Sequence, residues 1–331
     1  MTQALEVHEL RKSFPIRQGL FGRTAGHVHA VQDVSFAIEE GETLSLVGES
    51  GCGKSTVGRL ILRLLAPDHG AVTLEGQRMD TAPPETLRGL RRRVQMIFQD
   101  PFSSLSPRML VRDIIAEPLR NFGLAHGREI DDRVAELLEQ VRLPVDAMYR
   151  RAHEFSGGQR QRIGIARALA PRPSVIVCDE AVSALDVSVK AQIVNLLVDL
   201  QAELGISLLF ISHDLAVVEQ MSHRVAVMYL GRIVEIGRAA DVFGGAAHPY
   251  TAALLSAVPV PEPDDTRQRI VLQGDVPSPI NPPPGCAFHT RCPYAFARCR
   301  TEQPALRTRP GTGHLAACHL DTMPAQEEAI Q

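Results

Sequence analysis

The chain has no tryptophan, and lysine occurs at only three of its 331 positions, Lys12, Lys54 and Lys190. Aromatic residues make up 5% of the sequence without a basic stripe between them, and the formal net charge is -3, so nothing favours a nucleic-acid surface. No apolar run reaches the roughly 18 residues that span a bilayer. Residues 1–6 lack the features of a signal peptide, so we expect the chain to stay in the cytosol. Its six cysteines are then not expected to form structural disulfides.

A glycine-rich stretch follows the apolar run 43–47 and precedes residues 57–65, whose apolar positions recur at helical spacing. Strand, glycine-rich turn and helix form the context in which the pattern G-x-x-x-x-G-K-[ST] predicts a phosphate-binding loop. The stretch comprises Gly48, Glu49, Ser50, Gly51, Cys52, Gly53, Lys54, Ser55 and Thr56. Its glycines allow backbone N–H groups to turn inward around an anion, and the positive end of the following helix dipole adds to their field.

Two side chains of this stretch complete a nucleotide site. Lys54 can reach the β- and γ-phosphates as a point charge, and the Ser55 hydroxyl can ligate Mg²⁺. The alternative is a chance match in a glycine turn, and the strand before and the helix after the loop disfavour it. The sequence therefore predicts that the chain binds a nucleoside triphosphate.

Two adjacent acids, Asp179 and Glu180, end the apolar run 175–178. A buried strand that ends in acids delivers them to the carboxyl edge of a parallel sheet, where ligands bind. Asp179 is suited to hold Mg²⁺, and Glu180 is suited to accept a proton from an attacking water as general base. Taken alone, such a pair is more often solvated loop charge, but beside a phosphate-binding loop we favour the catalytic interpretation.

A second candidate anion site consists of Ser156, Gly157, Gly158 and Gln159, directly before an apolar helical segment. Small residues at a helix N-terminus expose backbone N–H groups, and Ser156 can also cap the helix. An ordinary capped helix is the alternative. Because the chain already has a complete phosphate loop, a second anion site suggests one that acts on a nucleotide held by another subunit.

The hydrophobic pattern alternates between strands and helices, which predicts an α/β fold with a mostly parallel sheet. We expect a loop at 11–27, helices at 128–141 and 156–170, and turns and helices throughout 99–165. The expected strands are 4–10, 29–39, 72–74, 94–98, 175–178, 206–211, 224–229 and 232–236.

Taken together, these motifs resemble those of the ATPase subunits of ABC transporters. The matching pieces, all in the family's order within residues 4–240, are 48–56, Gln99, 155–159, 175–180, 183–186 and 212–214. The resemblance implies a P-loop NTPase (RecA-like) core with an inserted helical subdomain at about 99–165 and an antiparallel β edge. This cassette would span residues 1–245 and would bind ATP and Mg²⁺.

The resemblance also assigns roles to single residues. It implies that Phe14 stacks on adenine, that Gln99 couples the Mg²⁺ and γ-phosphate site to a transmembrane partner, and that His213 holds the γ-phosphate. Phe155 replaces the usual leucine, and Ala181 stands where a proline is usual. Neither departure removes a catalytic group, so we expect a site competent for hydrolysis.

Other residues would act across a head-to-tail dimer that sandwiches ATP. By the same resemblance, residues 156–159 of one subunit contact the ATP held by the opposing subunit, and Asp186 organises that interface. The implied partners are a paired ATPase subunit (a heterodimer), two transmembrane permease subunits and an extracytoplasmic solute-binding protein. The chain would then lie peripherally on the cytoplasmic face of the inner membrane.

Finer resemblance comes from residues 98–101, 104–108, 182–188 and 248–251, which are similar to the oligopeptide/dipeptide importer branch. Within that branch they look like the second of two ATPases. The cargo stays open between peptides, which we favour, and nickel, glutathione or another small solute. A soluble ABC-type ATPase acting on nucleic acid is the less favoured class, because tandem cassettes and a long coiled coil are absent from the sequence.

Beyond residue 245 the composition shifts toward proline, and residues 246–331 are expected to form a small C-terminal extension. Four of the six cysteines gather there: Cys286, Cys292, Cys299 and Cys318. Such clustering suggests a soft metal site that staples a small segment. The resembling family tail is associated in some members with a [4Fe–4S] cluster, while Zn²⁺ and unligated thiols are the alternatives.

Overall fold

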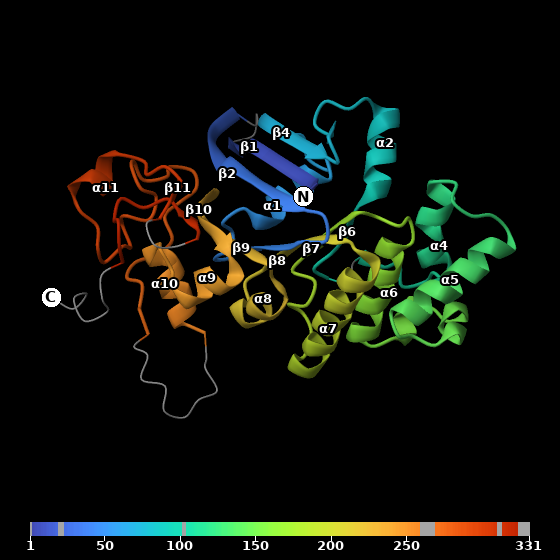
Figure 1. Cartoon of the computed structure of the whole chain (residues 1–331). Helices are drawn as coiled ribbons and strands as arrows, with labels where there is room; N and C mark the ends of the chain where they lie inside the picture. The colour runs from blue at the N-terminus through green and yellow to red at the C-terminus, as the bar shows by residue number, and fades with distance from the viewer. Residues whose placement is uncertain (1, 19–22, 101–103, 259–268, 310–312, 324–331) are drawn as a thin grey trace.

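The computed structural model describes residues 2–18, 23–100, 104–258, 269–309 and 313–323. They form two sheets with helices around them (Figure 1). The helices between β6 and β7 lie at one end of the molecule, and the C-terminal extension lies at the other (Figure 1). Within the described part of the chain, no helix is long and apolar enough to cross a membrane.

The larger sheet has the strand order β11-β12-β10-β9-β3-β8-β7-β6. From β9 to β6 all neighbours run parallel, whereas β10, β12 and β11 add an antiparallel edge. The bounds are β3 Thr43–Val47, β6 Val94–Ile97, β7 Val175–Asp179, β8 Ser207–Ser212, β9 Arg224–Tyr229, β10 Arg232–Arg238, β11 Arg307–Thr308 and β12 Leu315–Ala316. Every residue of β3, β7 and β8 is buried, which explains why these strands read as continuous apolar runs.

Alternate residues of the central strands enter two hydrophobic clusters on opposite faces of this sheet. In β8, Leu208 and Phe210 belong to one cluster, and Leu209 and Ile211 belong to the other. The first cluster packs the sheet against α4 Val111–Asn121, α5 Arg128–Gln140, α6 Gly157–Leu169 and α7 Val187–Leu204. The second packs it against α1 Lys54–Ile61, α2 Pro84–Arg93 and the smaller sheet. The predicted helices at 128–141 and 156–170 are confirmed within one residue at each end.

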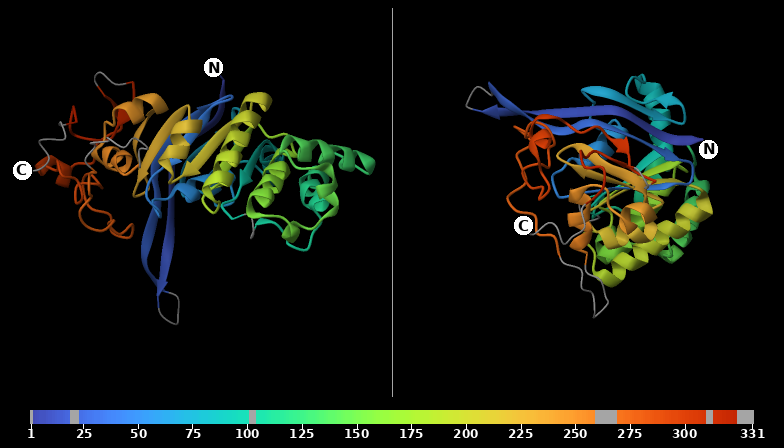
Figure 2. Two further views of the ribbon diagram at one scale, coloured as in Figure 1. Left: turned by 90° about the horizontal axis from the view of Figure 1, so that it is seen from below. Right: turned by 60° about the vertical axis from the view of Figure 1, so that its left-hand side comes forward.

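The smaller sheet is antiparallel, with the order β2-β1-β4-β5 and the bounds β1 Gln3–Gln18, β2 Arg23–Glu39, β4 His69–Leu74 and β5 Gln77–Arg78. The predicted loop at 11–27 is wrong, because β1 continues to Gln18 and β2 begins at Arg23, and the two paired strands project from the body (Figure 2). Pairs such as Ser13 with His29 and Phe14 with Val28 hold them together. The side chains from 11 to 17 are exposed or half-buried, so no hydrophobic alternation marked the strand.

The C-terminal extension joins both the sheet and the core. Its strand β12 pairs with β10 through Ala316 and Leu315, and Phe288 is 1% exposed inside the cluster that also contains the helices. The short helices α8 Leu215–Met221 and α9 Ala239–Gly244 precede it, and α10 Pro249–Ser256 and α11 Ala297–Thr301 lie within it. The extension thus shares a core with the rest of the chain.

Candidate functional site

The glycine-rich stretch forms a loop between the end of β3 and the start of α1 at Lys54. Gly48 and Gly53 have φ values of 149° and 106°, in the region that favours glycine. A Cβ at Gly48 would lie 2.1 Å from the Met228 carbonyl oxygen, and one at Gly53 would lie 2.1 Å from the Ala30 carbonyl oxygen. Both glycines are therefore required by the close packing of the loop against β9 and β2.

Lys54 is 4% exposed and lies inside the curve of this loop. Its Nζ donates hydrogen bonds to the carbonyl oxygens of Gly48 and Glu49, at 2.8 and 3.0 Å. Cys52 is also buried, and burial raises the pKa of its thiol, so it acts as a small packing residue beside the ammonium group. Ser50, Gly51 and Thr56 complete the loop. The loop backbone thus encloses the Lys54 ammonium group, a positive charge that suits an anion-binding loop.

Ser55 and Asp179 meet at the start of α1 and the end of β7. The Ser55 hydroxyl donates a hydrogen bond to Asp179 Oδ1 at 2.7 Å, and Asp179 is 4% exposed. Burial raises the pKa of Asp179, against the opposing effect of the Ser55 hydrogen bond. A hydroxyl and a carboxylate are hard oxygen ligands, so this pair fits the predicted Mg²⁺.

Glu180, Gln99 and His213 follow the ends of three neighbouring strands, β7, β6 and β8. Gln99 Nε2 donates a hydrogen bond to Glu180 Oε2 at 2.9 Å, and His213 Nδ1 lies 3.5 Å from Glu180 Oε1. Glu180 itself has φ 48°, an unusual left-handed conformation for a residue other than glycine. Strain of this kind clusters at functional sites, where the surrounding structure holds it in place. The structure therefore brings together the three residues that were predicted to be catalytic.

Ser156 caps α6 with a reciprocal pair of hydrogen bonds. Its hydroxyl accepts from the Gln159 backbone N–H at 3.3 Å, and the Gln159 side chain accepts from the Ser156 N–H at 3.0 Å. This is the capped helix that the sequence left as an alternative, and it does not test the role in trans. Ser156, Gln159 and Asp186 are exposed, whereas Gly157 is half-buried and Gly158 is buried with a Cβ position 2.3 Å from Val189 Cγ1.

Two further predicted features can be placed. Phe155 is 4% exposed and lies under the Arg150 guanidinium, 4.5 Å from the ring centroid, so the aromatic ring fills the core where a leucine was expected. Phe14 lies half-buried on β1, with Lys12 Nζ 5.7 Å from its ring centroid. Its stacking on adenine stays a prediction.

The sequence missed two partners of Glu49 in the phosphate loop. The Glu49 backbone N–H donates to the Tyr250 hydroxyl at 2.8 Å, and the Arg291 guanidinium makes two hydrogen bonds to the Glu49 carboxylate, at 2.8 and 3.1 Å. Both partners belong to the C-terminal extension, beyond residue 245. Tyr250 stands in segment 248–251, which carried the family resemblance, but nothing local signals Arg291, because 242 positions separate it from Glu49.

The four cysteines of the extension lie near one another, with the Cys286 N–H bonded to the Cys299 carbonyl oxygen at 2.8 Å. Burial raises the pKa of Cys286 to about 11 and that of Cys292 to about 12, and it also raises the pKa of Cys318. Among the residues that the structure describes, no three His, Cys, Asp or Glu side chains are grouped to hold a metal ion. The structure therefore does not support the predicted iron–sulfur or zinc site.

Comparison with known proteins is consistent across families, relatives and solved structures. Residues 31–183 match the ABC transporter family, and residues 234–299 match the oligopeptide/dipeptide transporter C-terminal region. A probable peptide ABC transporter ATP-binding protein, y4tS of Sinorhizobium fredii, is 54% identical over 96% of this chain and 89% of its own length. The oligopeptide transport ATP-binding protein AppF of Bacillus subtilis is 50% identical over 96% of this chain and 97% of its own length.

Among solved structures, the ATP-binding cassette MJ0796, determined as a dimer in a post-hydrolysis state with ADP and Pi, has a TM-score of 0.63 and 28% identity. The match covers 71% of this chain and 98% of that one. The shared fold includes the parallel sheet that carries the phosphate loop. This chain therefore belongs to the family of ATP-binding subunits of ABC transporters, and it carries the C-terminal region of the oligopeptide/dipeptide branch.

Proposed function

We propose that the chain hydrolyses ATP to drive the import of di- or oligopeptides through partner membrane subunits. The meeting of Glu180 with Gln99 and His213 carries the enzymatic part of this proposal. The matched C-terminal region and the peptide-transport names of the relatives support the cargo. The nucleotide site lies on the described cassette, whereas peptide selection belongs to partner proteins.

Hydrolysis requires a water to attack the γ-phosphorus, a base to take its proton, and ADP to leave. Glu180 is assigned as that base, because Gln99 and His213 approach its two oxygens from opposite neighbouring strands and hold one orientation. The water proton passes to the Glu180 carboxylate as the new P–O bond forms and the bond to ADP breaks. His213, 55% exposed, is free to face the γ-phosphate.

The phosphate loop and the Ser55–Asp179 pair are proposed to bind the triphosphate and its Mg²⁺. Lys54 exchanges its two backbone carbonyl partners for phosphate oxygens. Ser55 and Asp179 would hold Mg²⁺, which when bound neutralises negative charge on the phosphates. The exposed Ser156 and Asp186 are proposed to complete the site of a second, paired ATPase subunit, as the head-to-tail dimer requires.

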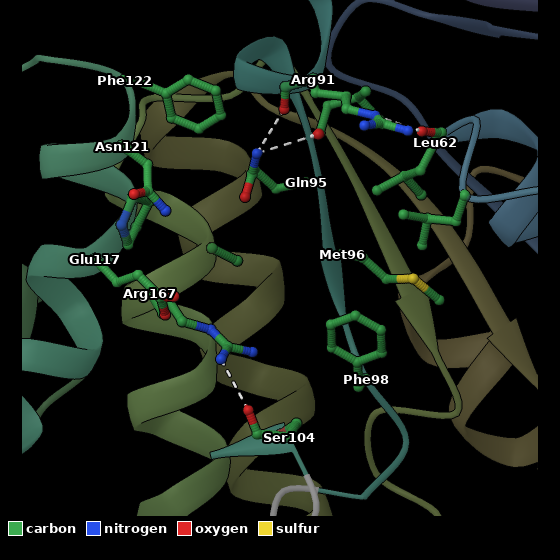
Figure 3. Close-up of a pocket in the computed structure, with 14 residues that line it drawn as sticks. Leu62, Arg91, Gln95, Met96, Phe98, Ser104, Glu117, Asn121, Phe122 and Arg167 are labelled. Carbon is green, nitrogen blue, oxygen red and sulfur yellow. Dashed lines mark hydrogen bonds between the residues drawn. The ribbon is translucent and has the colours of Figure 1, made fainter. Parts of the chain in front are cut away.

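A groove of about 610 Å³ lies beside this site, between β6, α4 and α6 (Figure 3). Its residues include Leu62, Leu64, Met96, Phe98, Phe122 and Arg167. Phe98 is 41% exposed and Leu64 is 51% exposed, so apolar surface is available to a partner. Phe98 directly precedes Gln99, which bonds Glu180. A molecule that binds in the groove and moves Phe98 would therefore also move the hydrogen-bond partner of Glu180. We therefore propose that a cytoplasmic segment of the permease binds here, placing the chain on the inner face of the membrane.

The test is reconstitution of the chain with its paired ATPase and permease subunits in vesicles. ATP hydrolysis should rise when the solute-binding protein is loaded with a short peptide. If ATP hydrolysis rises with glutathione or Ni²⁺ but not with peptide, the proposed cargo is wrong and the ATPase assignment stands. Failure of the chain to copurify with any permease would overturn the proposal that it drives transport.

For the four cysteines, the [4Fe–4S] cluster is a separate proposal that rests on the family resemblance and not on the arrangement of the described side chains. Chain purified without oxygen should then be brown and should contain about four iron and four sulfide per chain. Stoichiometric zinc would replace this proposal, and metal-free protein would leave the neutral thiols that the structure describes.

A further inference from the structure

The phosphate loop is held by residues that do not belong to the cassette. Glu49, the second residue of the loop, receives a bidentate pair of hydrogen bonds from Arg291, and its backbone N–H donates to the hydroxyl of Tyr250. Glu49 is 27% exposed and Arg291 is 8% exposed, so this ion pair is largely shielded from solvent. A planar guanidinium that meets a carboxylate with two parallel bonds fixes orientation as well as charge.

Arg291 is itself held rigidly. It follows Phe288, whose ring packs against Tyr229 at the end of β9 and against Tyr250 in α10, with centroid distances of 5.3 and 5.4 Å. Tyr229 and Tyr250 also contact each other at 4.7 Å. These three rings are almost fully buried, and the Arg291 backbone N–H donates to the Phe288 carbonyl oxygen at 3.0 Å, so the backbone of Arg291 is tied to this cluster. An arginine guanidinium is charged at physiological pH, so the pair with Glu49 joins two opposite charges.

The charge of Glu49 is unfavourable for the function of the loop. A carboxylate on a phosphate-binding loop repels a triphosphate unless a cation neutralises it. Lys54, the one lysine of the loop, bonds the backbone carbonyl oxygen of Glu49, whereas the Glu49 carboxylate bonds Arg291. Arg291 neutralises the Glu49 carboxylate and draws it to the side of the loop that faces the extension.

We propose that the C-terminal extension is a working part of the ATP site, with Arg291 as a positioning residue that neutralises Glu49 and presets the phosphate loop for the triphosphate. The extension then does more than complete the sheet, because ATP affinity depends on whether its Arg291 segment is docked. This proposal rests on ATP binding by the cassette, which family membership establishes, and it is independent of the cargo.

The test is a double-mutant cycle on the full chain, read by titration with a fluorescent ATP analogue in the presence of Mg²⁺. Arg291→Gln should weaken nucleotide binding about fivefold, because it leaves the Glu49 carboxylate unpaired beside the phosphates. Adding Glu49→Gln to Arg291→Gln should restore most of the lost affinity, since the repelling charge is then removed. Arg298→Gln is the matched control, because it breaks an exposed pair with Glu302 in the same extension and should leave affinity unchanged.

A purely structural role predicts a different pattern. If the ion pair only fastens the extension, Arg291→Gln lowers the melting temperature while the folded chain binds nucleotide normally, and that result overturns the proposal. A double variant that binds as weakly as Arg291→Gln alone also overturns it. If Arg291→Gln does not fold, Arg291→Lys is the second variant, because it keeps the charge and loses the bidentate geometry. We expect Arg291→Lys to bind nucleotide more weakly than the wild type, but by less than fivefold. If a folded Arg291→Lys variant binds nucleotide as the wild type does, although protease digests its undocked extension, the proposal is wrong.

Discussion

Ser55 Oγ lies 2.7 Å from Asp179 Oδ1, although 124 positions separate the two residues. The sheet explains the contact, because β3 and β7 both run parallel to β8 and end at the same edge. The helix that follows β3 and the acid that ends β7 are thereby delivered to one point. The strand order thus brings together the two residues that are proposed to hold Mg²⁺.

Asp179→Asn should raise the Mg²⁺ concentration needed for half-maximal ATP hydrolysis by about tenfold, because an amide is a weaker ligand than a carboxylate. The measurement is a Mg²⁺ titration of phosphate release at saturating ATP. Asp199→Asn removes an exposed carboxylate that pairs with Arg142, and it serves as the control. An unchanged Mg²⁺ requirement would remove Asp179 from the metal site.

Glu180→Gln should bind ATP but lose turnover by about 10²- to 10⁴-fold, because a neutral amide cannot accept the water proton. Gln99 can still bond the new side chain, so the strand ends should keep their arrangement. Nucleotide binding and phosphate release, measured on the same preparation, separate the two effects. Undiminished phosphate release would sink the assignment of Glu180 as base.

Lys54→Ala and Ser156→Arg should fail in different ways. Lys54→Ala deletes the charge that faces the β- and γ-phosphates, so nucleotide binding itself should weaken. Ser156→Arg alters an exposed helix start, so the chain should still bind nucleotide while the assembled dimer no longer hydrolyses it. Equal loss of binding in both variants would argue against a site completed by a second subunit.

His248 should make stability depend on pH. It is 1% exposed, faces Glu235 and Arg309, and lies near His314, which is 3.1 Å from Glu235. Burial lowers the pKa of His248 from 6.5 to about 4. The unfolded chain therefore binds the proton first, so the free energy of unfolding should fall as pH drops from about 6.5 toward 4, by about 3 kcal/mol over the interval.

Denaturant titrations across that pH range measure this slope. His248→Asn keeps an acceptor for the Tyr250 N–H, which caps α10, but cannot take up a proton, so its slope should be shallower. The exposed His126→Asn is the matched control and should retain the wild-type slope. A slope unchanged by His248→Asn would assign the pH dependence to other groups.

Local sequence predicted those parts of the site that depend on neighbours in the chain. The phosphate loop and the acids after β7 stand at strand ends that continuous apolar runs reveal. The paired ends of β1 and β2 within residues 11–27 escaped prediction because their side chains are not sorted by burial, so backbone pairing alone defines them. The pairing of Glu49 with Arg291 also escaped, because no local pattern encodes a contact over 242 positions. The cysteines cluster in the sequence, but the described residues contain no group of three side chains that could hold a metal ion.

The strand order has a consequence for synthesis of the chain. The phosphate loop leaves β3, which is flanked by β8 and β9, and those strands end only at Ser212 and Tyr229. A nascent chain that has emerged only as far as α7 cannot yet seat β3 in its sheet, so the nucleotide loop matures late in translation. ATP can act as a folding ligand only after that point, and Arg291 emerges later still.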